Sequence, residues 1–241
     1  MNEKIWVEKI RTSVRSTYEL LFAIFLTAEN LCALMEGLIS SEGSVLSFEI
    51  LSLLMCIAVW VVYAAAGKSD YAGKGLRFVS GIIKAEFIIN WIVAIICVLL
   101  GIAVFVFGDS VSVAANEVLA EFVPGASIGA VAEILVKFAG IACIVFAVLL
   151  VVYNYLHVYH EHEFAKSLRE TVDTDTNCVC EQKDVMIWMI ILAVVALIGL
   201  IIGIADKESP LSIIESVCNI LKYLSVYKFV HDSFGKIEET L

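Results

Sequence analysis

Six long apolar runs dominate this chain of 241 residues. A helix needs about 20 apolar residues to cross the hydrocarbon core of a bilayer. With 61% hydrophobic residues, the composition is far from that of an average soluble domain. The sequence therefore predicts an all-α, polytopic integral membrane protein with one transmembrane domain over residues 1–241. The predicted crossings lie near residues 17–39, 48–66, 85–107, 129–157, 185–205 and 210–230.

The basic residues between these runs alternate from one connection to the next. The connections 40–47 and 108–128 contain neither lysine nor arginine. Cytoplasmic segments of membrane proteins carry the excess of Lys and Arg. We therefore expect both termini and the connections 67–84 and 158–184 in the cytoplasm, with the plasma (inner) membrane of a bacterium as the expected location. The residues that carry this pattern are Lys4, Lys9, Arg11, Arg15, Lys68, Lys74, Arg77, Lys84, Lys166, Arg169 and Lys183.

The six runs are arranged as three tandem helical hairpins in this interpretation. The sequence YLHVY at Tyr155–Tyr159 matches YLSVY at Tyr223–Tyr227. Internal repeats would explain the match, and repeats are common in transporters. Convergence explains it equally, because tyrosine is enriched at the headgroup level. The sixth run contains Glu215 and Lys222, so an amphipathic helix lying in the interface is the alternative to a sixth crossing.

The fourth helix is predicted to be longer than a bilayer is thick. No proline occurs from Gly129 to Glu170, and 42 helical residues span about 63 Å, twice the bilayer core of about 30 Å. We expect this helix to extend into the cytoplasm as a stalk that ends near residue 168. A short helix is expected within 108–128, ahead of Pro124.

Five of the charged residues inside the predicted crossings are candidates for a functional site. Depth in the membrane pairs Glu29 with Lys222 and Glu36 with Lys137, because ionised groups in hydrocarbon pair or line water. The structural interpretation is that such pairs fix which helices pack together, and we favour it. The functional alternative is a proton or ion path, or a site for a polar substrate. The five residues are Glu29, Glu36, Glu133, Lys137 and Lys222.

Two groups of potential metal ligands lie in or next to the stalk. His157, His160 and Glu161 share one helix face, and Cys178 and Cys180 would add thiolates. A solvated polar face is the alternative, so we expect contact with a protein, and no bound metal or cofactor. A second group resembles a calcium loop in its spacing but has Cys178 where a glycine is needed, and we interpret it as an acidic loop. Its members are Asp173, Asp175, Asn177, Glu181 and Asp184.

The remaining features exclude some functions and leave two open. The net charge of −10 argues against a nucleic-acid partner, which needs a clustered basic surface. No nucleophile–base–orienter set is present, so we do not expect an enzyme. We predict a non-enzymatic permease, channel or transporter-like membrane subunit. The alternative is a membrane-anchored interaction or regulatory protein that recruits a cytoplasmic partner through the stalk 158–184 and the C-terminal tail. The expected partners are the lipid bilayer, another copy of the chain, or that cytoplasmic protein.

Overall fold

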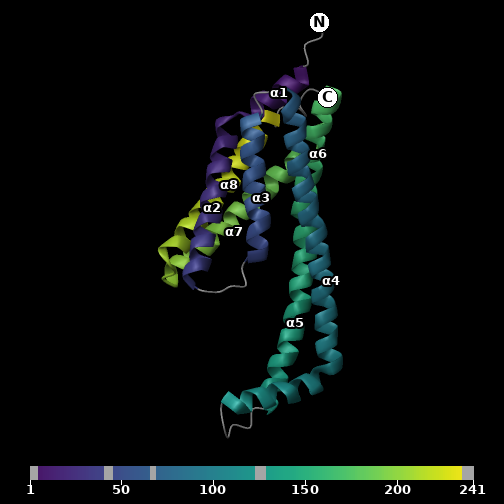
Figure 1. Ribbon diagram of the computed structural model, residues 1–241, viewed down its shortest axis with the longest axis vertical. Helices are drawn as coiled ribbons and strands as arrows, with labels where there is room; N and C mark the ends of the chain where they lie inside the picture. Colours follow the sequence, from purple (N-terminus) through teal and green to yellow (C-terminus); the bar gives the residue numbers. More distant parts are fainter. Residues whose placement is uncertain (1–4, 41–45, 66–68, 123–128, 235–241) are drawn as a thin grey trace. The chain divides into compact units, whose positions relative to one another are not determined.

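The structure, a computed structural model, describes residues 5–40, 46–65, 69–122 and 129–234, and every regular element in them is a helix (Figure 1). The all-helical prediction is therefore confirmed. The helices are α1 (Ile5–Val14), α2 (Thr17–Ser40), α3 (Leu46–Ala65), α4 (Ser69–Phe122), α5 (Gly129–Tyr153), a short π-helix (Asn154–Val158), α6 (Tyr159–Thr174), α7 (Gln182–Ala205) and α8 (Pro210–Phe234).

Within the described residues, four helices are long and apolar enough to cross a membrane. They are Thr17–Glu36, Lys74–Gly108, Val136–Thr174 and Gln182–Ala205. This supports a multi-pass membrane protein. The described part of α3 adds a shorter apolar segment, Leu53–Ala64, and α8 carries Glu215 and Lys222. Six crossings in three hairpins stay a prediction.

The chain divides into two compact units. The first combines Met1–Lys84 with Tyr159–Leu241, and the second is Ala85–Val158. Helix α4 begins in the first unit and continues in the second. Whether both units belong to one transmembrane domain stays a prediction.

In the first unit, α8 packs against both α2 and α7, and α3 packs against α2 (Figure 1). The first long helix is therefore a neighbour of the last. Three contacts along the pair show that α8 runs antiparallel to α2. The hydroxyl of Ser209, just before α8, donates a hydrogen bond to Glu36. Lys222 donates to Glu29, and Tyr18 donates to Asp232. Helix α8 thus follows α2 over most of its length.

A hydrophobic core holds several helices together at one end of this unit. Helix α1 buries Val7, Ile10 and Val14, which are three and four residues apart and therefore share one face. The other core residues come from the end of α3, the start of α4, α6, the start of α7 and the end of α8. They are Val62, Leu76, Phe164, Leu168, Val185, Met189, Phe229, Val230 and Phe234.

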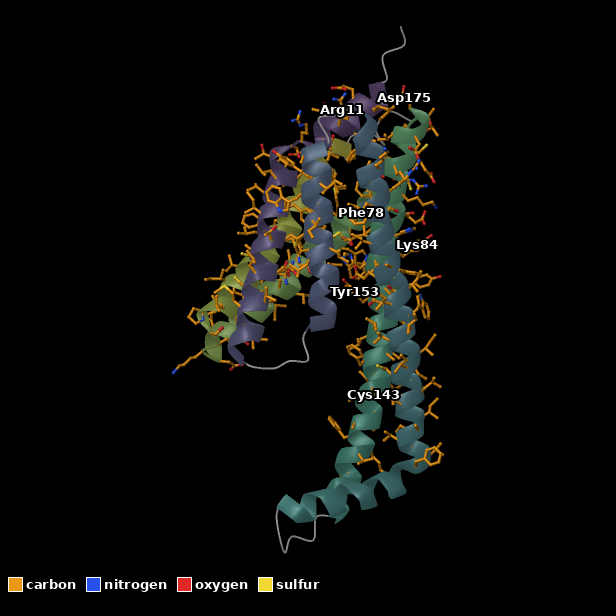
Figure 2. All side chains as sticks on the ribbon, viewed as in Figure 1. Arg11, Phe78, Lys84, Cys143, Tyr153 and Asp175 are labelled. Atoms are coloured by element: carbon orange, nitrogen blue, oxygen red, sulfur yellow. The ribbon has the colours of Figure 1, made fainter. Side chains whose placement is uncertain are left out.

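Two polar contacts lie at the same end of the first unit. The Val7 N–H donates to Asp175 Oδ1 at 3.3 Å, and Arg77 Nη2 donates to Asp173 Oδ2 at 3.2 Å. Arg11 of α1 and Asp175 both lie at this end (Figure 2). The structure thus gathers the described parts of all the segments that the sequence predicts to be cytoplasmic.

Two sequence predictions about helix boundaries need correction. The sequence places the connection 67–84 between two crossings, but α4 begins at Ser69 and continues for 54 residues to Phe122. The short helix expected within 108–128 is the last part of this same helix. The basic segment is helical because Leu76, Ile82 and Ile83 are buried, and their packing stabilises the helix beyond its intrinsic propensity.

The predicted stalk is helical but does not stand alone. The helix that starts at Gly129 continues through the π-helix and ends at Thr174, later than the predicted residue 168. Helix α6 packs against α1 and α7 and buries Phe164, Leu168 and Thr171. The extension of this helix into the cytoplasm stays a prediction, and within the first unit an apolar face of α6 belongs to the core.

In the second unit, α4 and α5 run antiparallel and approach closely at two glycines. A Cβ atom on Gly101 would lie 2.6 Å from Ile144 Cγ1, and one on Gly140 would lie 2.9 Å from Val104 Cγ1. Small residues let membrane helices approach in this way. Further along the pair, Asn90 Nδ2 donates to Asn154 Oδ1 at 3.3 Å, and Asn154 Nδ2 donates to the Phe87 carbonyl at 3.0 Å.

Candidate functional site

The candidate site is a row of polar residues where α8 lies along α2. On α8, Glu215, Asn219 and Lys222 are spaced by four and three residues, which places them on one helix face. On α2, Glu29 and Glu36 are two turns apart and also share a face. We name this set, together with Ser209 just before α8, the α2–α8 seam.

The centre of the seam is an ion pair. Lys222 Nζ lies 2.6 Å from Glu29 Oε2 and 2.9 Å from Glu29 Oε1. Both side chains are largely buried, with exposed fractions of 14% for Lys222 and 16% for Glu29. The structure therefore contains the pair that depth in the membrane predicts from the sequence.

Carboxylates outnumber cations along the seam. The Ser209 hydroxyl donates to Glu36 Oε1 at 2.6 Å. Glu215 is half-buried and close enough to Glu29 and Glu36 for their negative charges to repel its own, while Lys222 attracts it. The seam thus contains three carboxylates and one ammonium group.

Two seam residues lack hydrogen-bond partners within the part of the chain that the structure describes. Glu215 accepts no hydrogen bond there. Asn219 Oδ1 is buried and also has no partner there. A buried acceptor without a donor costs roughly 1–3 kcal/mol, so a water, proton or cation at this point would be stabilising.

The other predicted intramembrane charges are not brought into the seam by the described contacts. Lys137 is an exposed residue of the second unit, so its pairing with Glu36 stays a prediction. The side chain of Glu133 lies outside the described residues.

Sequence reasoning missed the polar contacts that hold α3 against α2. Trp60 Nε1 donates to Thr27 Oγ1 at 2.9 Å, and Asn30 Nδ2 lies 3.4 Å from Cys56 Sγ. The signal was the spacing of Thr27 and Asn30, three residues apart on the helix that also carries Glu29. These contacts fix α3 beside the seam.

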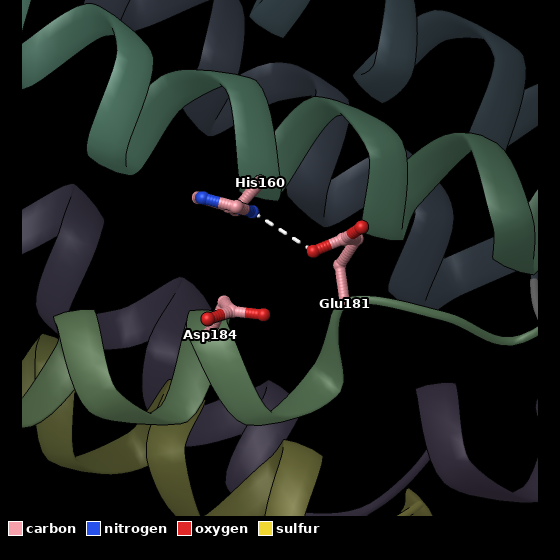
Figure 3. A group of neighbouring side chains, drawn as sticks. All are labelled: His160, Glu181 and Asp184. Carbon is pink, nitrogen blue, oxygen red and sulfur yellow. Dashed lines mark hydrogen bonds and ion pairs between the residues drawn. The ribbon is translucent and has the colours of Figure 1, made fainter.

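A second group of candidate site residues lies outside the seam, in the first unit. His160 Nδ1 is 2.9 Å from Glu181 Oε2, and Asp184 is close to both. The three potential ligand atoms lie within 4.8 Å of one another (Figure 3). The sequence placed His160 in one candidate group and the two carboxylates in another, and the fold brings them together.

The remaining metal candidates do not join that group. His157 belongs to the second unit, where its ring lies 5.1 Å from the ring of Tyr153. Cys178 Sγ is 3.5 Å from Thr176 Oγ1, and the Cys180 N–H donates to Ser167 Oγ. Glu161 is half-buried and also lies outside the group. The acidic residues of the calcium-like spacing are likewise separated, since Asp173 pairs with Arg77 and Asp175 accepts from Val7.

Comparison with protein-family models, curated proteins and solved structures found no match to this chain.

Proposed function

We propose that this protein is a non-enzymatic permease, channel or transporter-like membrane subunit, in which the α2–α8 seam carries protons or small monovalent cations. The observation that supports this most directly is the charge of the seam. Its carboxylates, Glu29, Glu36 and Glu215, are matched by a single cation, Lys222.

A purely structural role accounts for only part of the seam. One ion pair is enough to fix which helices pack together. An ionised side chain within a membrane helix is costly unless it is paired or hydrated. Glu215, two turns before Lys222 on α8, adds a further carboxylate to the seam, and Asn219 adds a buried oxygen without a donor in the described residues. Both are the groups that a passing proton or cation would contact.

The packing of α8 supports a membrane-spanning position for the seam. Helices α2 and α7 both include candidate spans, and α8 packs against both. Because α8 follows α2 antiparallel from Glu36 to Tyr18, a crossing by α8 fits better than an interfacial helix. A crossing by α8 would agree with the six crossings, and with both termini in the cytoplasm, that the charge pattern predicts.

The alternative function, recruitment of a cytoplasmic partner through residues 158–184 and the C-terminal tail, stays a prediction. Helix α6 already uses one face for the core, which leaves less of it for a partner. Residues 235–241 of the tail lie outside the described residues.

Measurements of ion flux across liposome membranes test the proposal. The full-length protein is reconstituted with a pH-sensitive dye inside the vesicles, and a potassium diffusion potential drives proton entry. Parallel vesicles with sodium and potassium indicators measure the two alkali cations. We expect flux above that of protein-free vesicles, and a several-fold lower flux for Glu215→Gln.

The matched control is Glu170→Gln, the same substitution on α6 outside the seam, which should leave the flux unchanged. Wild-type flux equal to that of protein-free vesicles would contradict the proposal. So would flux that Glu215→Gln and Glu29→Gln leave unchanged, and the seam would then be a packing device.

A further inference from the structure

A histidine and two carboxylates meet where α6 passes the first turn of α7. His160 comes from the first turn of α6, Glu181 directly precedes α7, and Asp184 lies in the first turn of α7. Their side chains point toward one another across the space between the two helices (Figure 3). His160 and Glu181 are partly exposed, at 23% and 30%, so an ion from solution can reach them.

We propose that His160, Glu181 and Asp184 bind a divalent first-row transition metal ion. Imidazole nitrogen suits zinc and iron, and carboxylate oxygen suits manganese. A mixed set of one nitrogen and two carboxylates therefore fits Mn²⁺, Fe²⁺ or Zn²⁺. Three protein ligands leave further positions for water, which is typical of an open site.

The distances agree with ligation. Metal–nitrogen and metal–oxygen bonds are about 2.0–2.2 Å long, so two ligands at right angles lie about 3 Å apart. The observed distance of 2.9 Å between His160 Nδ1 and Glu181 Oε2 has this value. All three atoms fall within 4.8 Å of one another, so a single ion can contact each after small rotations of the side chains.

Ordinary packing explains part of this arrangement. The His160–Glu181 contact is a sufficient hydrogen bond by itself, and carboxylates are favourable near a helix N-terminus. Neither effect requires the two carboxylates to converge on one imidazole. Their like charges repel at this range, and Asp184 has no hydrogen-bond partner in the described part of the chain. A divalent cation would remove the repulsion and use the third side chain.

This proposal replaces the sequence-based preference for protein contact at His160. The sequence groups His160 with His157, Glu161, Cys178 and Cys180, and favours a solvated polar face over a metal there. A bound ion would instead connect α6 to α7 and stabilise their packing. It is independent of ion flux through the seam.

Manganese binding to the full-length protein tests the site. Protein in detergent is stripped with a chelator and titrated with MnCl₂, and the electron paramagnetic resonance signal measures free Mn²⁺. We expect about one Mn²⁺ per chain, as one set of ligands provides, and displacement by Zn²⁺. His160→Gln and Asp184→Asn should each weaken binding several-fold, and Mn²⁺ should raise the Tm of the wild type more than that of either variant.

The matched control is His162→Gln. His162 lies two residues away on α6, is exposed to 19%, and contacts Glu163 in a similar pair. It should bind Mn²⁺ like the wild type. Absence of saturable Mn²⁺ and Zn²⁺ binding to the wild type would overturn the site. Equal losses in His160→Gln and His162→Gln would also overturn it. Asp184→Asn changes an exposed side chain, so it gives a result even if His160→Gln does not fold.

Discussion

The Glu29–Lys222 pair is the residue-scale feature with the clearest energetic consequence. Removing one partner leaves a buried charge, which costs on the order of 3–5 kcal/mol, whereas removing both costs less. We expect Glu29→Gln and Lys222→Met each to lower the Tm in detergent, and the double variant to recover part of the loss. Thermal unfolding of the four proteins measures the coupling. Losses that simply add would mean that the two side chains do not interact.

Asp232 gives a pH-dependent prediction outside the predicted crossing 210–230. The hydrogen bond from His231, at 2.7 Å, and another from Tyr18 lower the pKa of Asp232 below its ordinary value of 3.8. The ionised form is therefore favoured by folding. Its stabilisation is present above pH 3.8 and is lost as the pH falls through the lower pKa of the folded state.

Asp232→Asn should accordingly lower the Tm slightly near neutral pH, and its difference from the wild type should shrink as the pH falls below 3.8. Thermal unfolding across a pH series measures this difference. Asp206→Asn, which changes an exposed residue after α7, serves as the control. A difference that grows on acidification would contradict the assigned direction of the pKa shift.

Single residues differ in how far the sequence predicts their contacts. Glu29 and Lys222 could be matched because charges in hydrocarbon need partners and both lie near the middle of apolar runs. The partners of His160 could not be found this way. His160 and Glu181 are 21 positions apart and meet only because α6 and α7 pack side by side. No periodicity within either helix encodes that meeting.

At the scale of elements, the approach of α4 and α5 depends on Gly101. A Cβ there would meet Ile144 Cγ1 at 2.6 Å and the Gly140 carbonyl at 3.0 Å, and the backbone cannot rotate away. Gly101→Leu should therefore lower the stability by about 1–3 kcal/mol. Gly199→Leu on α7 is the control, since its Cβ would meet nothing within 4 Å. Both variants gain helix propensity of about 1 kcal/mol, so the difference in Tm reports packing. Equal Tm values would rule out a close contact.

Helix lengths were harder to predict than helix existence. The segment 69–84 contains three glycines and four charged residues, which are Asp70, Lys74, Arg77 and Lys84. Such a composition is typical of a connection between helices. Burial of Leu76 in the core outweighs this. The π-helix at Asn154–Val158 has no sequence signal, because it accompanies the hydrogen bond of Asn154 to the Phe87 carbonyl, a contact with another helix.

At the scale of the whole molecule, the charge pattern and the packing give one topological prediction. The described parts of the basic segments are joined in the first unit by a shared core, and the positive-inside rule assigns such segments to the cytoplasm. Their meeting at one end of a bundle is what a chain with an even number of crossings requires. The sequence predicts that these segments share one side of the membrane, because lysine and arginine mark orientation directly. It did not predict which helices are neighbours, since α2 and α8 lie at opposite ends of the chain.

Labelling with a membrane-impermeant thiol reagent on intact cells tests that topology. In a background with all cysteines replaced by serine, we expect a cysteine introduced at Ser112, within 108–128, to react from outside. A cysteine restored at Cys178 should react only after the cells are opened, because residues 170–184 are predicted to face the cytoplasm. A cysteine at Glu239 should behave like Cys178. Reaction of the cysteine at Glu239 from outside would place the C-terminus on the outer side of the membrane. It would remove the crossing by α8, and the Glu29–Lys222 pair would then no longer lie within the bilayer.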